Sequence, residues 1–200
     1  LIIMTMKINI LSIWLLSLTL SICAIILIGG YTRISDSGLS ITECLPISGV
    51  MYPLNEIQWQ IEFSKYQKID EFMLVNSTMT LNEFKFIYFW EWFHRFFARL
   101  IGLLYLAPLI YLLIKKKIQN YYFVRIFLIG FLLGVQAVIG WYMVQSGLIG
   151  RVDVSQYRLA MHLTMAFIIL GITFQTFLDA NMRHINNKNN YYQTSNEFLF

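Results

Sequence analysis

Four long apolar stretches constrain the fold of this 200-residue chain more than any other feature. Each is long enough to cross a bilayer as a helix, because about 20 apolar residues span the hydrocarbon core. The expected helices cover residues 11–30, 84–114, 122–144 and 156–178. The chain is 58% hydrophobic and 13% charged, which is about half the charge of an average soluble domain. We therefore predict an all-α polytopic membrane protein whose four transmembrane helices pack as a bundle.

A long polar loop, residues 31–83, separates the first two expected helices. Connections of this length usually have a function of their own. Within the loop, residues 55–66 place three aromatic side chains at helical spacing: Trp59, Phe63 and Tyr66. This spacing indicates a short amphipathic helix that lies on the membrane or caps the bundle, and an ordinary solvent-side helix fits equally well. Thr80 and Glu83 have the spacing of a capping box for the next helix.

Basic residues are distributed unevenly between the two sides of the expected bundle. One side receives all of the following: Lys7, Lys115–Lys117, Arg125, Arg183 and Lys188. The positive-inside rule makes this the cytoplasmic side, with both termini on it and the long loop outside. The net charge of +4 then reflects the orientation of the chain in the membrane. We therefore expect no nucleic-acid partner. Residues 1–180 form the membrane unit in this prediction, and residues 181–200 form a polar tail.

Ionisable residues gather at the start of the second expected helix, in the sequence EWFHRFFAR from Glu91 to Arg99. Such residues are rare in membrane helices and commonly mark a site. At 100° per residue, Glu91, His94, Arg95 and Arg99 share one face, and the phenylalanines lie opposite. The alternative is that the arginines reach out to lipid phosphates and His94 lies at the interface. Four ionisable groups on one face favour a site.

His162 is the only other histidine in an expected membrane helix. Its helix runs in the same direction as that of His94, and the two histidines lie at similar depth. Two imidazoles facing each other across a bundle can hold haem iron from both sides. Arg95, Arg99 and Arg158 lie near the rim, where they could bind haem propionates through charge-assisted hydrogen bonds. A structural His162 that hydrogen-bonds within the bundle is the alternative.

The third expected helix carries features suited to close packing. Gly130 and Gly134 form a small-xxx-small pair, and Gly140 follows further along. Gln136 lies in the middle of the apolar stretch, so we expect it to hydrogen-bond to a neighbouring helix.

Five segments together carry a family resemblance. In chain order they are GGYTRISDSGLSITE (29–43), PLNEIQW with EFSKY (53–66), NEFKFIYFWEWFHRFFARLIG (82–102), GWYMVQSGL (140–148) and VSQYRLAMHL (154–163). They resemble haem A synthase, in its mitochondrial and alphaproteobacterial branch with a long first outer loop. The resemblance covers roughly residues 11–178.

This resemblance implies an oxidoreductase that oxidises a porphyrin methyl group of haem O to formyl, giving haem A for cytochrome oxidase. Family members have two similar four-helix halves, one for a haem b cofactor and one for the substrate haem. The motifs place the substrate-site histidines at His94 and His162 and the family's essential glutamate at Glu91. A carboxylate one turn from an iron ligand could move a proton during the oxidation. The resemblance also implies a bacterial or mitochondrial inner membrane and, from the pathway, contact with haem O synthase.

The sequence departs from the family pattern in two respects. Cys44 stands where a tryptophan is common, and alone it cannot form the loop cysteine pair of another branch. The second half, with the haem b histidines, is not in this sequence. We therefore expect the substrate-haem half of haem A synthase, acting as a homodimer or with a second-half partner. The alternatives are a bis-histidine electron carrier of the cytochrome b kind and an inactive truncated remnant.

Overall fold

The computed structural model describes residues 10–43 and 51–197, with side chains up to residue 182; Cys44 lies outside these ranges. Its helices are α1 (Ile10–Ile34), α2 (Glu56–Tyr66), α3 (Asp70–Leu74), α4 (Leu81–Ile114), α5 (Asn120–Gln145) and α6 (Gln156–Glu197). Four of them, α1, α4, α5 and α6, are long and apolar enough to cross a membrane. The prediction of an all-α membrane bundle is confirmed.

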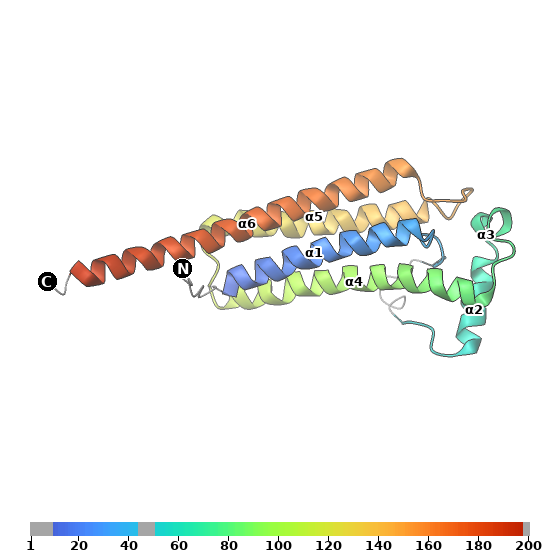
Figure 1. Ribbon diagram of the computed structural model, residues 1–200, viewed down its shortest axis with the longest axis horizontal. Coiled ribbons are helices and arrows are strands. Elements are labelled where there is room, and N and C mark those ends of the chain that lie inside the picture. The colour runs from blue at the N-terminus through green and yellow to red at the C-terminus, as the bar shows by residue number, and fades with distance from the viewer. Residues whose placement is uncertain (1–9, 44–50, 198–200) are drawn as a thin grey trace, which may run out of the picture.

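The four long helices lie side by side along the length of the molecule (Figure 1). The short helices α2 and α3 lie at one end, which we call the cap end. The start of α1 and the end of α6 lie toward the opposite end, the terminus end. Helix α1 packs against both α4 and α6, and α5 packs against α6. Helix α1 therefore packs between α4 and α6, and α6 packs between α1 and α5.

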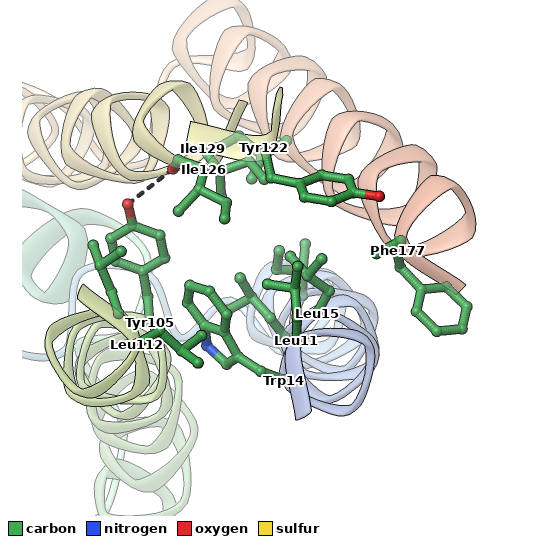
Figure 2. Close-up of a cluster of buried hydrophobic side chains, with 14 of the residues drawn as sticks. Leu11, Trp14, Leu15, Tyr105, Leu112, Tyr122, Ile126, Ile129 and Phe177 are labelled. Carbon is green, nitrogen blue, oxygen red and sulfur yellow. Dashed lines mark hydrogen bonds between the residues drawn. The ribbon is translucent and has the colours of Figure 1, made fainter. Parts of the chain in front are cut away.

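Apolar side chains from all four long helices fill the bundle toward the terminus end, as Figure 2 shows. Two hydrogen bonds between helices are part of this core. The indole of Trp14 donates to the carbonyl of Leu104 at 2.8 Å, and the hydroxyl of Tyr105 donates to the carbonyl of Ile126 at 2.9 Å. Such bonds keep buried polar atoms satisfied where no water can reach them.

The small residues of α5 pack differently from one another. A Cβ atom on Gly130 would overlap the hydroxyl of Tyr105, so this glycine makes the expected close contact. A Cβ atom on Gly134 would have no neighbour within 4 Å. The two glycines therefore do not act as a pair, because only one of them faces another helix closely.

The short helix expected at residues 55–66 is present as α2 and caps the bundle. Asn55 is its N-cap, since its side chain accepts a hydrogen bond from the backbone of Gln58 at 2.9 Å. The buried aromatic side chains of α2 pack against the first turns of α4: Trp59, Phe63 and Tyr66 meet Phe84 and Tyr88. The capping box of Thr80 and Glu83 at the start of α4 is also confirmed.

Two helices extend further than the sequence predicted. Helix α1 does not end at Gly30 but continues to Ile34, since glycines in membrane helices commonly serve close packing and need not end the helix. Helix α6 continues beyond Leu178 to Glu197. No glycine or proline follows Gly171 to interrupt it. Most of the predicted polar tail is therefore helical.

Candidate functional site

Glu91 is a buried charge on α4, only 3% exposed. Its Oε2 atom accepts hydrogen bonds from the hydroxyl of Ser40 at 2.7 Å and the backbone N–H of Ile41 at 2.9 Å. Its Oε1 atom forms an ion pair with Arg95, one helical turn away. Both carboxylate oxygens are therefore bonded, as a buried charge requires.

The partners of Glu91 belong to a segment that we call the strap, Gly38–Ile41. The side chain of Leu39 is buried and meets Gly147 in the α5–α6 connection, where an added Cβ would lie 2.8 Å from Leu39 Cδ2. At the other end of the strap, Ile41 packs into the aromatic cluster between α2 and α4. The strap therefore crosses the cap end of the bundle.

Arg95 also holds the strap. Its guanidinium donates to the carbonyl of Ile41 at 3.2 Å and to the carbonyl of Glu43 at 3.4 Å, in addition to its pairing with Glu91. The sequence suggested a propionate-binding role for this arginine. In this structure the Arg95 side chain reaches the loop, because the folded loop places carbonyl oxygens within hydrogen-bonding distance.

His94 lies one turn beyond Glu91 on α4 and packs against α1. A Cβ atom on Gly29 would lie 3.1 Å from Cε1 of His94, so the missing side chain lets the ring approach the α1 backbone. This explains why α1 carries a glycine in its interior, where glycine otherwise weakens a helix by roughly 1 kcal/mol.

His162 has a similar neighbour on another helix. A Cβ atom on Gly140 of α5 would lie 2.9 Å from Cε1 of His162. The side-chain nitrogen of Gln136 lies 3.3 Å from Nε2 of His162 and donates to the His162 carbonyl at 3.1 Å. The hydrogen bond expected for Gln136 is thus confirmed. Nδ1 of His162 is buried and has no hydrogen-bond partner.

The structure brings the two histidines into one region. Their helices, α4 and α6, both pack on α1. His94 lies beside Gly29 of α1, and His162 lies beside Gly140 of α5. Among the side chains of residues 10–43 and 51–182, no three His, Cys, Asp or Glu groups are placed to hold a bare metal ion. Two imidazoles, each beside a glycine that leaves room for the ring, fit a haem ligated from both sides.

Two further arginines were predicted to line the site. Arg158 lies one turn before His162 on α6, and its guanidinium carbon is 4.8 Å from the centre of the Tyr142 ring. Its Nη1 atom is buried without a hydrogen-bond partner, so the side chain retains donor capacity for an anion. Arg99 is half-buried, one turn beyond Arg95 on α4.

Several residues that shape the site were not identified from the sequence. Gly29 was interpreted as part of a helix end, and Ser40 as part of a loop. The motif GGYTRISDSGLSITE contains both residues, but only the fold shows that they meet His94 and Glu91. Glycine within a long apolar stretch was the available signal for Gly29.

The cap end also buries a second carboxyl group, Glu71 of α3, which is 6% exposed. Burial is the main reason that its pKa is raised to about 8, and the negative charges of Glu91, Asp36 and Asp153 add to the effect. A hydrogen bond with Tyr66 acts in the opposite direction. Burial therefore favours the protonated form of Glu71 in the folded protein.

This raised pKa predicts a pH-dependent stability. Between the ordinary pKa of 4.5 and about 8, only the unfolded chain loses the Glu71 proton, so folding becomes less favourable as pH rises. The contribution present at pH 4 should fall by on the order of 5 kcal/mol by pH 9. Glu71→Gln should remove this dependence, measured as thermal unfolding of the chain in nanodiscs at several pH values. If stability changes with pH in the same way in the wild type and in Glu71→Gln, Glu71 does not cause the pH dependence.

Comparison with known proteins identifies the family of the chain. The profile of the cytochrome oxidase assembly proteins (COX15-CtaA) matches residues 12–199. The chain belongs to this family. Three similar curated relatives carry the name haem A synthase. The relative from Maricaulis maris is 52% identical over 169 residues, which are 84% of this chain and 50% of the relative.

The other two relatives match a similar share of this chain. The Parvibaculum lavamentivorans protein is 44% identical over 83% of this chain and 48% of its own length. The Paracoccus denitrificans protein is 48% identical over 80% of this chain and 42% of its own length. The chain thus spans about half the length of the relatives that it matches in this family. No solved structure matches the chain.

Proposed function

We propose that this chain binds haem O and takes part in oxidising one porphyrin methyl group to formyl, as the substrate-haem half of a haem A synthase. The enzyme is then an oxidoreductase acting on a CH group. One observation carries the proposal. In a chain 52% identical to a haem A synthase, the two motif histidines lie on α4 and α6, two helices that both pack on α1.

In this proposal, the site residues have three roles: iron ligation, propionate binding and proton transfer. His94 and His162 would supply the axial nitrogens, and bound haem would supply the iron and the methyl group to be oxidised. Arg99 and Arg158 would bind propionates, and Arg158 has a buried guanidinium nitrogen without a partner to support this role. Glu91 would accept or relay a proton, for which it must exchange one of its bonds to the strap.

Family membership supports the remaining parts of the proposal. The haem b cofactor would lie in a second four-helix half. Haem O synthase would deliver the substrate. The basic residues at the terminus end support an orientation with both termini on the cytoplasmic or matrix side of an inner membrane.

A haem profile tests this function directly. Membranes from cells that make haem O would be extracted with and without the chain, and the haems separated by chromatography. Haem A or its hydroxymethyl intermediate appearing only with the chain would support catalysis. Haem O that co-purifies unchanged would support a binding half that needs its partner. A chain with both His94 and His162 replaced by alanine is the matched control.

The same experiment separates the alternatives. Haem b alone on the purified chain, cycling between oxidation states, would point to an electron carrier and contradict the proposal. The absence of any haem on a stable, membrane-inserted chain would identify an inactive remnant.

A further inference from the structure

Gln136 is an amide within an apolar helix, and its contacts are all directed at one residue. Its side-chain nitrogen is 3.3 Å from the ring atom Nε2 of His162 and 3.1 Å from the carbonyl oxygen of His162. Gly140, one turn further along α5, lets the same imidazole approach the helix backbone. Helix α5 therefore holds His162 by its ring and by its backbone.

The hydrogen bond to the His162 carbonyl determines which end of the Gln136 amide faces the imidazole ring. An amide oxygen facing the carbonyl of His162 would be repelled, so the NH₂ group must lie on that side. The NH₂ group can only donate, and Nε2 of His162 must therefore accept. The ring proton is then on Nδ1, which is buried without a partner. A histidine that ligates a metal through Nε2 needs this same tautomer, with Nδ1–H free to donate elsewhere.

We propose that Gln136 is a placeholder for iron at His162. One amide hydrogen occupies the Nε2 lone pair in the absence of haem, and the other keeps its bond to the His162 carbonyl throughout. This role rests on the proposed function, in which His162 ligates the substrate haem. Gln136 is then a positioning residue: it prepares the ring tautomer and gives up the lone pair when haem enters.

The proposed role of Gln136 predicts whether its replacement speeds or slows haem association. A residue that only supports the ring should, when removed, weaken haem binding. A placeholder competes with iron for the lone pair, so its removal should speed haem association. A net hydrogen bond of roughly 0.5–1.5 kcal/mol corresponds to an acceleration of about 2- to 10-fold.

The first arm of the test uses the haem-free chain in nanodiscs. NMR of the chain labelled with ¹⁵N-histidine reports which ring nitrogen carries the proton, and the chain has three histidines to assign. We expect wild-type His162 in the Nδ1–H form and a mixture of tautomers in Gln136→Leu. An Nε2–H form in the wild type, or an unchanged His162 signal in the variant, would overturn the proposal.

The second arm measures haem association by stopped-flow absorbance with haem O and, in parallel, haem b. Gln136→Leu should associate about 2- to 10-fold faster than the wild type and still form a low-spin complex. Gln136→Met, unbranched and of similar length, serves if the leucine variant does not fold. Val138→Ala is the matched control, because Val138 lies on α5 and is 62% exposed to the membrane; its rate should equal that of the wild type.

The outcomes separate this proposal from the proposed function. Normal haem binding by the wild type with slower or unchanged association in both Gln136 variants would overturn the placeholder role alone. Failure of the wild type to bind any haem would overturn the proposed function, and the placeholder role with it.

Discussion

Replacing Glu91 with leucine is expected to destabilise the protein by about 3 kcal/mol, the order found when one partner of a buried ion pair is removed. Arg95 would lose its counter-charge, and the hydroxyl of Ser40 and the N–H of Ile41 would lose their acceptor. The strap should then detach from α4. Glu91→Gln, which keeps an oxygen acceptor, should cost less.

Thermal unfolding in nanodiscs measures the stability change, and limited proteolysis at the strap measures its release. Glu56→Gln is the matched control, because its ion pair with Lys85 is solvent-exposed on the carboxylate side. Exposed pairs contribute at most about 1 kcal/mol. Equal stability of Glu91→Leu and Glu56→Gln would show that Glu91 does not hold the loop.

Replacing His94 with alanine is expected to lower the affinity for haem at least about 100-fold, on the order of 3 kcal/mol. The variant removes one of two proposed axial ligands and leaves a space between α4 and Gly29. Any haem that remains bound should change from a low-spin to a high-spin spectrum. His162→Ala should behave in the same way.

Haem titration followed by absorbance measures both effects. Added imidazole should enter the space left in the alanine variant and restore the low-spin spectrum. His184→Ala is the control, because His184 lies beyond the apolar span of α6, Gln156–Met182. A low-spin haem retained in His94→Ala without added imidazole would rule out this histidine as a ligand.

The membrane helices could be predicted from the sequence because the length of an apolar run is set by the bilayer itself. Their ends were harder to place. Gly29 and Gly30 look like a helix end, yet the first of them makes room for an imidazole on another helix. A single sequence cannot distinguish the two uses of glycine, since the partner of Gly29 is 65 positions away in the chain.

The site could be predicted in part. Matched depth and motif both selected His94 and His162, because helix direction and helix spacing are local properties. The attachment of Ser40 and Ile41 to Glu91 could not be predicted, since the segment is an irregular loop without periodicity. For the same reason the hydrogen bonds of Arg95 with the loop carbonyls could not be predicted, and its role toward a haem propionate stays a prediction.

The central position of α1 has a consequence for synthesis. Helices α4 and α6 carry the two histidines and both dock on α1, yet α6 is the last of the four spans to leave the ribosome. While the chain is being made, α1 and α4 can meet early and His94 can settle beside its glycine. His162 arrives only when α6 enters the bilayer. The nascent protein therefore passes through a stage with a single imidazole in place. If the two histidines ligate haem as proposed, haem captured at that stage would be held from one side only.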